Sequence, residues 1–360
     1  MSSIRLAIAG VGNCASALVQ GCFWYRSQDS TVGLMHETLG GYKVGEIQPV
    51  CGFDVDSRKT GVDLGTAIRE EPNCTEVFAD VPDQIGAPVY RGPSFDGVAS
   101  HTAEHEESKR VVEDVNEPPV DITEKLIEHD VDVLVCYLPV GSTEAAEHYA
   151  EAAIESGVGF VNAIPVFLAS DNEWARRFED ANLPIVGDDI KSQVGATITH
   201  RNLVQLFQDR GVDLENTFQL NVGGNTDFLN MLDRNRLAEK KTSKTDAVNG
   251  LLDEPLADDQ IHIGPSDYID FLDDEKNAFI RMEGRGFGGS TVKLDVELRV
   301  EDSPNSAGSA VDAIRCAKIA LDRGSGGALE APSAFCMKHP PLELPDAEAM
   351  RRIESFANTP

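Results

Sequence analysis

Residues 4–15 read Ile4-Arg-Leu-Ala-Ile-Ala-Gly10-Val-Gly12-Asn-Cys-Ala15, and this stretch decides the fold class. The apolar run Ile4–Ala9 predicts a buried strand, and the GxGxxA pattern after it predicts a tight turn into a helix. The first glycine permits the turn, the second lets a pyrophosphate approach the backbone, and the small alanine lets helix pack on strand. A purely structural glycine turn is the alternative, but the strand–turn–helix context favours a dinucleotide site.

Strands and helices alternate through the N-terminal half of the chain. Further apolar runs predict strands, and one of them is continuous enough to suit a strand covered on both faces. Ser142 is expected to cap a helix that ends near Gly157. This alternation favours a parallel sheet with right-handed crossovers, which is a doubly wound, Rossmann-type α/β fold. The predicted strands are Pro49–Asp54, Val131–Leu138, Gly159–Ala163 and Pro184–Val186.

Two segments interrupt the alternation. Residues 24–48 separate the first helix from the second strand. Residues 86–119 are rich in Pro, Gly and acidic side chains and show no clear period. We expect both segments to be long loops or small insertions.

The sequence pattern changes after about residue 212. Thr291–Glu301 alternates strictly between apolar and charged residues, which predicts a half-exposed strand of an antiparallel sheet. Thr217–Val222 and Asn277–Glu283 are expected to be further strands of this sheet. Ser303-Pro304 then predicts a helix with a capping hydroxyl and a proline in its first turn.

The chain is therefore predicted to have two domains. Residues 1–199 plus 302–360 would form a discontinuous NAD-binding domain of the Rossmann type. Residues 200–301 would form an inserted α+β domain with a mixed sheet. This arrangement places a cleft between the two domains.

Asp54 ends the second predicted strand, where an acidic residue binds the adenosine ribose of a dinucleotide. Its separation from Gly12 exceeds the usual ~20 residues, and the insertion at 24–48 accounts for the difference. No Arg follows Asp54 directly, which favours NAD over NADP. The alternative is a solvated carboxylate at a strand end. Pro139–Ser142 and Asn162–Pro165 end other predicted strands at the same edge of the sheet.

The net charge of −30, from 61 acidic and 31 basic residues, argues against binding to nucleic acid or anionic membranes. No stretch approaches the ~20 apolar residues of a membrane span, and the N-terminus lacks the features of a signal peptide. Two interpretations of the acidity remain open: a halophile's surface adapted to high salt, and an ordinary acidic mesophilic protein. The seven cysteines show no CxxC, so we expect reduced thiols in a cytoplasmic protein.

Lys240, Lys241 and Lys244 form a basic cluster in an acidic chain. On a helix Lys240 and Lys244 share one face, where like charges repel. A solvated basic patch and a pair of ammonium groups that bind a phosphate are equally compatible with this spacing. A lysine beside another cation has a lowered pKa, which suits proton transfer near neutral pH.

Two further segments combine groups that suit a ligand site. Asn221–Asp227 is either a plain turn or a source of donors to a sugar phosphate and of one carboxylate to a metal ion. Glu301–Pro304 places a carboxylate and a hydroxyl at a helix N-terminus, which favours an anion or an anion with a metal ion.

Taken together, these motifs resemble those of the myo-inositol-1-phosphate synthase family, in its shorter archaeal and bacterial form. They run in order along nearly the whole chain, and the set is specific although no single member is. The glycine turn has Asn13-Cys14 where the eukaryotic form is richer in Gly and Asn. The motifs are Gly10–Ala15, Phe53–Asp56, Tyr137–Ser142, Gly187–Ser192, Asn221–Asp227, Ser243–Asp246, Gly264–Asp267, Asp302–Asn305 and Met337-Lys338.

The resemblance implies an NAD-dependent isomerisation. D-glucose 6-phosphate would bind in its open form, and NAD would oxidise the C5 hydroxyl to a ketone. The acidified C6 would then lose a proton and attack the C1 aldehyde. Return of the hydride gives 1L-myo-inositol 1-phosphate, the first step of inositol biosynthesis. Relatives are tetramers, and the exposed face around Thr291–Glu301 is the expected contact surface.

The resemblance also implies the site residues. Lys240 and Lys338 would handle the proton at C5. Lys276 would lie near C1, and Lys244 near the phosphate. Asp189 would orient the nicotinamide or a lysine. A divalent metal ion, or ammonium or potassium, would lie beside the pyrophosphate on Asp227, Asp302 and Ser303. The implied catalytic set is Lys240, Lys244, Lys276, Lys338, Asp189, Asn221 and Asp227. The cofactor-binding set is Gly10, Gly12, Asn13, Cys14, Ala15, Asp54, Pro139, Gly141, Ser142, Ala163, Asp189, Asp302 and Ser303.

Two other functions remain open. An ordinary NAD-dependent dehydrogenase of a small hydroxy or amino acid would have the same layout and would release NADH in step with substrate loss. A regulatory protein that senses NAD would use the cleft for binding alone, but such a sensor has no need of four convergent amines.

Overall fold

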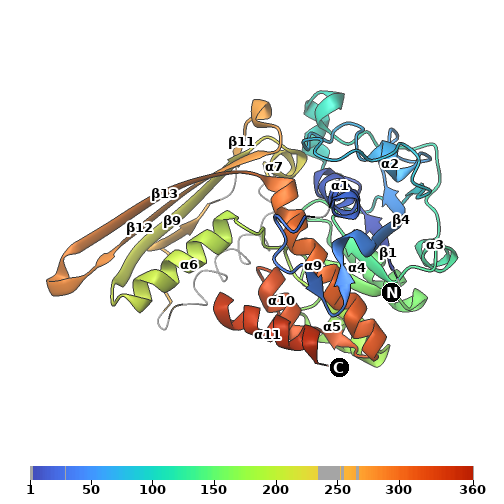
Figure 1. Ribbon diagram of the computed structural model, residues 1–360. Coiled ribbons are helices and arrows are strands. Elements are labelled where there is room, and N and C mark those ends of the chain that lie inside the picture. The colour runs from blue at the N-terminus through green and yellow to red at the C-terminus, as the bar shows by residue number, and fades with distance from the viewer. Residues whose placement is uncertain (1–2, 29, 234–251, 253–254, 265–266, 360) are drawn as a thin grey trace.

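The polypeptide is organised around two separate sheets, shown in the computed structural model of Figure 1. The structure describes residues 3–28, 30–233, 252, 255–264 and 267–359. A seven-stranded sheet with helices on both faces forms the body of the molecule. A second sheet of long strands, with one helix along it, extends away from that body.

The seven-stranded sheet starts from the stretch that opens the sequence. Ile4–Ala9 forms β1 as predicted, and β1 pairs in parallel with β4 on one side and β6 on the other. The strand order β14-β8-β7-β6-β1-β4-β5 reverses at β1, and every pair is parallel. The doubly wound, Rossmann-type prediction is therefore confirmed. The other strands are β4 (Ile47–Asp54), β5 (Val89–Arg91), β6 (Val133–Cys136), β7 (Gly159–Asn162), β8 (Pro184–Val186) and β14 (Gly327–Ala328).

Helices cover both faces of this sheet, which explains why its strands are continuous apolar runs. α1 (Asn13–Ser27) and α9 (Asp302–Arg323) pack on one face, and α3, α4 and α5 pack on the other. α9 runs from the second sheet back to the seven-stranded sheet and ends before Gly324, which has left-handed backbone. The remaining helices of the body are α2 (Leu64–Ala67), α3 (Ile122–Glu128), α4 (Thr143–Ser156), α5 (Asn172–Asp180), α10 (Glu330–Cys336) and α11 (Asp346–Asn358).

Across the part of the chain that the structure describes, no helix has both the length and the apolar composition needed to cross a bilayer.

The two segments predicted as loops contain short strands that the sequence analysis missed. β5 lies within 86–119 and extends the parallel sheet by one edge strand. β2 (Thr38–Leu39) and β3 (Tyr42–Lys43) form a small hairpin within 24–48. Strands of two or three residues are too short to show a period in the sequence, so tertiary pairing alone reveals them.

Both predicted hydroxyl caps are wrong. The hydroxyl of Ser142, at the start of α4, donates to the carbonyl oxygen of Pro139 at 2.6 Å. Asp96 instead accepts from the first amides of α4, at 2.9 and 3.1 Å. The hydroxyl of Ser303, at the start of α9, donates to Asp274 at 2.8 Å. Carboxylates distant in sequence have displaced the local caps, which no local pattern could show.

The second sheet is mixed, as predicted. Its three long strands, β9 (Asp213–Gly223), β12 (Glu275–Arg285) and β13 (Thr291–Glu301), are antiparallel neighbours. The short strands β10 (Ile261–Ile263) and β11 (Asp267–Tyr268) pair with β9 in parallel. α6 (Ala196–Asp209) lies along the inner face, where its apolar side chains meet those of β12, and the opposite face is open (Figure 1). The short helix α7 (Thr226–Asn230) follows β9.

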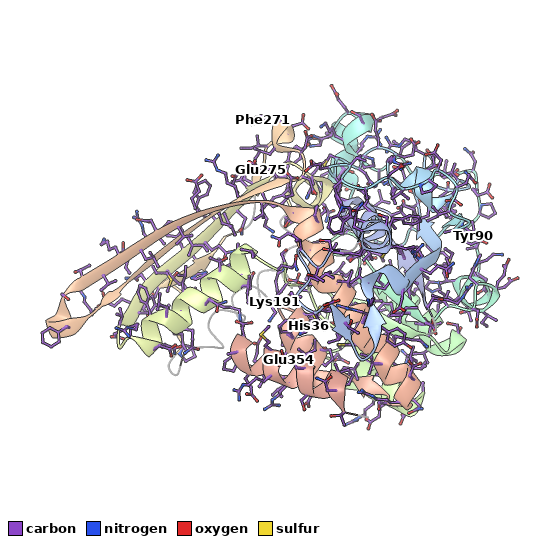
Figure 2. The ribbon with its side chains drawn as sticks, viewed as in Figure 1. His36, Tyr90, Lys191, Phe271, Glu275 and Glu354 are labelled. Carbon is purple, nitrogen blue, oxygen red and sulfur yellow. The ribbon has the colours of Figure 1, made fainter. Side chains whose placement is uncertain are left out.

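A buried ion network joins the second sheet to the body. Lys191, which follows β8, donates from Nζ to the carbonyl oxygen of Ala334 at 2.7 Å and pairs with Asp346 of α11 at 3.2 Å. Arg201 of α6 pairs with the same carboxylate at 2.9 Å. Figure 2 shows Lys191 between α6 and the C-terminal helices. The network therefore anchors α6, and with it the inner face of the second sheet, to the body.

Candidate functional site

Two neighbouring cavities open at the carboxyl ends of the central parallel strands, where the strand order reverses and ligands bind in this class of fold. Cavity 1 lies between the body and the second sheet. Cavity 2 lies over the end of β4. Both are lined by Gly12, Tyr137, Leu138, Thr226 and Asp227. The two cavities therefore adjoin along the glycine turn and the residues that follow β6.

The glycine turn between β1 and α1 borders both cavities. Gly10 has a φ of +91°, and a Cβ there would lie 2.6 Å from the carbonyl oxygen of Tyr137. At Gly12 a Cβ would meet no atom within 4 Å and would project into open space. Ala15 is fully buried between helix and strand. Gly10 is thus required by the backbone itself, whereas the space at Gly12 is available to a ligand.

Asp54 connects the end of β4 to the glycine turn. Its Oδ2 accepts a hydrogen bond from Val11 N at 2.7 Å. Its Oδ1 accepts from the amides of Val55 and Asp56 at 2.7 and 2.9 Å. Asp54 also lines cavity 2. The backbone therefore holds this carboxylate at the wall of the cavity where a ribose-binding acid is expected.

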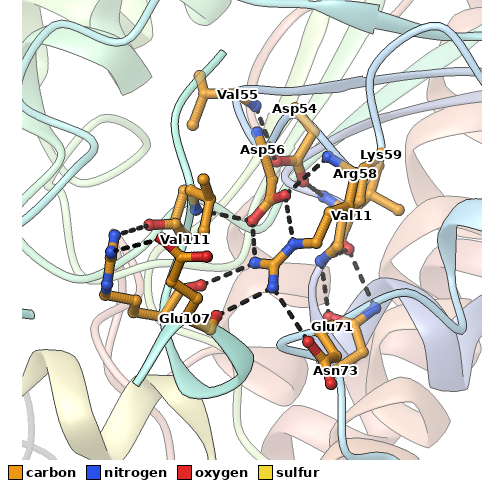
Figure 3. Close-up of polar contacts among 12 residues, drawn as sticks. Val11, Asp54, Val55, Asp56, Arg58, Lys59, Glu71, Asn73, Glu107 and Val111 are labelled. Carbon is orange, nitrogen blue, oxygen red and sulfur yellow. Dashed lines mark hydrogen bonds and ion pairs between the residues drawn. The ribbon is translucent and has the colours of Figure 1, made fainter. Parts of the chain in front are cut away.

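Two basic residues hold the backbone next to Asp54 and the glycine turn (Figure 3). Buried Lys59 donates from Nζ to the carbonyl oxygen of Val11 at 2.8 Å, and its burial lowers the pKa of Lys59. Arg58 pairs with buried Asp56 and donates to the carbonyl oxygen of Glu107 at 2.9 Å. The contact of Arg58 with Glu107 holds the segment 86–119, which was predicted to be a loop, in place. Residues of this segment line one side of cavity 2.

The other predicted cofactor residues fall into two groups. Pro139 lines cavity 2 and Ala163 lines cavity 1. Gly141 and the buried Ser142 line neither cavity. The Ser142 hydroxyl points back to the carbonyl oxygen of Pro139. These two residues shape the backbone of the turn and do not face the cavities.

Asn13 and Cys14 line cavity 1 from the start of α1. The side-chain oxygen of Asn13 accepts from the amides of Cys74 and Thr75 at 2.7 and 3.2 Å, so it ties α1 to a neighbouring loop. Burial raises the pKa of Cys14 to about 12, with smaller contributions from nearby carboxylates. Cys14 is therefore a neutral thiol at the cavity wall.

Lys276 of β12 lies in cavity 1 among three carboxylates. Its Nζ is 3.0 Å from Oδ1 of Asp302, at the start of α9. Burial disfavours the ammonium form, but Asp302, Asp227 and Asp189 outweigh burial and raise the pKa of Lys276 above its usual value. A lysine held in its ammonium form is suited to stabilise a developing oxyanion.

Lys338 and Asp189 form a second charged pair in cavity 1, with Nζ 2.7 Å from Oδ1. The backbone reinforces the pair, because Lys338 N donates to the carbonyl oxygen of Asp189 at 2.6 Å. The preceding residue, Asp188, is fully buried and accepts hydrogen bonds from the amides of Leu168, Ala169 and Ser170. One acid of this dipeptide therefore fixes the backbone, while the other faces the cavity.

The residues predicted to hold a cation lie at the start of α9 and in α7. The hydroxyl of Ser303 donates to Oδ1 of Asp274, and burial, then Asp302, raises the pKa of Asp274 to about 7. No cluster of three or more His, Cys, Asp or Glu side chains that could hold a metal ion occurs among the described residues. The three predicted ligands, Asp227, Asp302 and Ser303, all line cavity 1.

A row of polar side chains runs along the inner face of β9 toward cavity 1. Thr217, Gln219 and Asn221 occupy alternate positions of the strand and are buried. Nε2 of Gln219 donates to Oδ1 of Asn221 at 3.2 Å. His200 of α6 has Nδ1 3.3 Å from Oε1 of Gln219 and Nε2 2.7 Å from Oγ1 of Thr217. Gln219 and Asn221 line cavity 1, so the row ends at the site.

The sequence analysis proposed Asn221 but missed Gln219 and His200. Polar residues at alternate positions of a predicted strand were an available signal, because the inner face of a covered strand is normally apolar. The segment before α6 was missed as well. Ser192, Gly195 and Thr197 all line cavity 1, at the start of a helix whose N-cap has no side-chain partner.

Cavity 1 thus brings together most of the predicted catalytic set, namely Lys276, Lys338, Asp189, Asn221 and Asp227. Lys240 and Lys244 lie outside the described residues, as does Lys241.

Comparison with known proteins shows similarity over nearly the whole chain. Residues 195–303, which include α6 and the three long strands, match the family model described as myo-inositol-1-phosphate synthase. The chain is 54% identical over 363 residues to inositol-3-phosphate synthase of Corynebacterium glutamicum, an alignment that covers 99% of this chain and 98% of the relative. It is 54% identical over 362 residues to the protein of the same name from Mycolicibacterium smegmatis, with 98% and 97% covered.

A solved structure shows the same architecture. A myo-inositol-1-phosphate synthase-related protein from Thermotoga maritima superposes with a TM-score of 0.80 at 26% identity, covering 99% of this chain and 98% of that one. The likeness therefore extends over both sheets.

Proposed function

The chain belongs to the myo-inositol-1-phosphate synthase family, and we propose that cavities 1 and 2 hold glucose 6-phosphate and NAD for the reaction of that family. The chain converts glucose 6-phosphate to an inositol phosphate, and this family is dependent on NAD. One observation carries the assignment of the site: Lys276, Lys338, Asp189 and Asn221 converge on a cavity that also borders Gly12.

The described residues fit NAD. The open space at Gly12 leaves room for a pyrophosphate, and Asp54 stands at the wall of cavity 2 for the adenosine ribose. The nicotinamide would lie toward cavity 1, beside Ala163 and Asp189. When bound, NAD would accept a hydride from C5 of the substrate and return it at the end of the cycle. The proposed cofactor contacts are Gly10, Gly12, Asn13, Cys14, Asp54, Pro139, Ala163 and Asp189, while Ala15, Gly141 and Ser142 support them.

The Lys338–Asp189 pair is proposed to handle the proton at C5. Oxidation of a hydroxyl requires that its proton leaves as the hydride leaves, so a base must stand beside the oxygen. Nζ of Lys338 would take this proton while it passes one of its own to the carboxylate of Asp189, so that the pair as a whole gains one proton. Lys240 is proposed as the second amine at C5.

Lys276 is proposed to act at C1. When C6 attacks the C1 aldehyde, negative charge develops on the C1 oxygen. The carboxylates around Lys276 keep it charged, so it stabilises that oxygen and supplies the proton.

A cation beside the pyrophosphate is proposed on Asp227, Asp302 and Ser303. Lys276 already pairs with one oxygen of Asp302, so the cation would bind the other. We expect activity to fall after stringent chelation and to return on addition of a divalent metal ion. Full activity in the chelated protein, with ammonium or potassium present, would remove the divalent option.

The substrate phosphate is proposed to lie at the start of α6. Ser192 and Thr197 offer hydroxyl groups there, and the N-terminus of the helix attracts an anion. Lys244 is proposed to supply the counter-charge.

Assembly and location are further parts of the proposal. Leu220 and Phe279 are each about 40% exposed on the open face of the second sheet, which supports burial of that face in a homotetramer. The domain division at 199 and 302 is supported by the return of α9 to the body. All seven cysteines are free, which supports a reducing, cytoplasmic environment.

Single-turnover absorbance at 340 nm tests the roles of the lysines. Lys276→Met should oxidise C5 and then stall before ring closure, which leaves a lasting NADH signal. Lys338→Met should give no NADH signal, because the first step is blocked. Lys43→Met, at an exposed position of β3 outside both cavities, is the matched control and should behave as the unsubstituted protein. Identical traces from the two Met variants would contradict the assigned roles.

A further inference from the structure

The polar row on β9 crosses a part of the molecule that is otherwise apolar. Ile280 and Met282 of β12 and Val204 and Phe207 of α6 form the surrounding core. His200 is fully buried in it, and burial lowers the pKa of His200 to about 4, so the ring is neutral near pH 7. Buried polar groups destabilise a core unless every donor and acceptor is matched. Each donor in this row therefore needs an acceptor, and each acceptor a donor.

One atom at the end of the row is unmatched. Asn221 is only 2% exposed, and its Nδ2 has no hydrogen-bond partner among the described residues. A buried donor without a partner is costly, which points to an acceptor supplied from outside the chain. Asn221 lines cavity 1, where an oxygen of a bound ligand could supply that acceptor.

If Nδ2 of Asn221 faces the cavity, the direction of every other hydrogen bond in the row is determined. Asn221 can turn its NH₂ group to the cavity only if its oxygen accepts from Gln219. Gln219 then turns its own oxygen to Nδ1 of His200, and that nitrogen must carry the proton. Nε2 of His200 is left as an acceptor, for which the Thr217 hydroxyl at 2.7 Å is the donor.

We propose that His200 and Gln219 are positioning residues that hold the Asn221 amide with its NH₂ group toward the substrate, with His200 as the Nδ1–H tautomer. This proposal rests on the placement of Asn221 against the substrate in the proposed function. It extends that function by making Asn221 a donor, which suits a carbonyl or phosphate oxygen.

The other tautomer of His200 would make Asn221 present an acceptor, not a donor, to the cavity. The Thr217 hydroxyl also lies 2.8 Å from the carbonyl oxygen of Arg281, and its single proton can serve one acceptor at a time. If that proton went to Arg281, His200 would carry its proton on Nε2. Both amides would then turn over, and Asn221 would present an oxygen that accepts from a substrate hydroxyl. The two arrangements are therefore distinguishable by the position of one proton.

The first test measures that proton in the unsubstituted enzyme. Histidine labelled with ¹⁵N distinguishes a protonated ring nitrogen from a bare one, and loss of a signal in His200→Gln identifies the residue. We expect protonated Nδ1 and bare Nε2 for His200 at pH 7.5. Protonated Nε2 with bare Nδ1 would overturn the proposal, and no substituted protein needs to be active for this result.

The second test measures coupling between the row and Asn221. Gln219→Met removes both hydrogen bonds and should lower kcat/KM about tenfold, the expected loss for one oriented hydrogen bond. Asn221→Ala should lower it at least as much. In the double variant, Gln219→Met should add less than about a twofold further loss, because its only route to the substrate is through Asn221.

Leu214→Met is the matched control, since Leu214 belongs to the same core but its cross-strand partner is Gly284, not a residue opposite the row. It should leave kcat/KM unchanged in both backgrounds. Independent, additive losses from Gln219→Met and Asn221→Ala would overturn the positioning role while leaving Asn221 in the site. Unchanged activity in Asn221→Ala would instead contradict the placement of Asn221, and with it the purpose of the row.

Discussion

The two sheets contribute to the same cavity in different ways. In the seven-stranded sheet the strands are apolar, and the groups that face the ligand stand at the last position of a strand or in the turn after it, as Asp54 and Gly12 do. In the second sheet the groups come from within strands, as Asn221 of β9 and Lys276 of β12 show. A covered parallel sheet therefore separates its core from its site, whereas the second sheet uses the same strands for both.

This contrast predicts that substitution within the second sheet affects chemistry most. Lys276→Ala should lower turnover roughly 100- to 1,000-fold, because it removes the charge that faces a developing oxyanion. NAD affinity should stay within about threefold, since the glycine turn and Asp54 belong to the other sheet. Product assays and NAD titrations check the two values. Turnover within tenfold of the unsubstituted protein would remove Lys276 from the chemistry.

The turn regions should show the reverse pattern. Gly12→Val fills the open space at the glycine turn and should weaken NAD binding on the order of 100-fold, while the fold survives. Gly21→Ala is the matched control: a Cβ at Gly21 also meets nothing within 4 Å, but this residue lies outside both cavities. NAD titration and thermal unfolding of both variants measure the difference. Equal NAD affinities in the two variants would mean that the turn does not hold the cofactor.

Acid should weaken the second sheet through His200. The pKa of His200 in the folded protein, about 4, lies below its ordinary value of 6.5. The stability that the neutral ring contributes is therefore complete above pH 6.5 and is lost as pH falls toward 4, by about 3 kcal/mol. Gln at this position does not titrate, so His200→Gln should lack this part of the pH dependence. Denaturant unfolding from pH 7 to pH 4 makes the comparison, and parallel curves would show that His200 does not titrate in this range.

The last prediction concerns the net charge of the whole chain, which affects both sheets equally. The net charge of −30 is screened within ~3 Å at 1 M salt but over ~30 Å at 0.01 M. We expect the unfolding temperature to fall on transfer to dilute buffer, as a surface adapted to high salt requires. Full stability in dilute buffer would instead identify an ordinary acidic protein.

The sequence predicted the fold better than the site. Apolar runs and glycines located β1, β8 and β13 closely because burial on one or both faces imposes a period that the sequence shows. The short strand β5 and the Asp96 cap escaped, because each depends on a partner distant in sequence. Local physics could not locate such pairings.

The site divides in the same way. The glycine turn and Asp54 follow from their position at strand ends, and the structure places them at the cavities. Lys276 and Lys338 came from family resemblance, since nothing in their local sequence marks them. His200 was missed because its importance lies in a contact with β9 that only the packing of α6 creates.

The central claim is that NAD is consumed and regenerated within one catalytic cycle. The most direct test incubates the purified protein with glucose 6-phosphate and catalytic NAD in high salt. Phosphate released from the product by periodate is assayed while absorbance at 340 nm is followed. We predict periodate-labile product in excess over NAD with no lasting NADH signal. NADH that accumulates in step with substrate loss would contradict the claim and indicate an ordinary dehydrogenase.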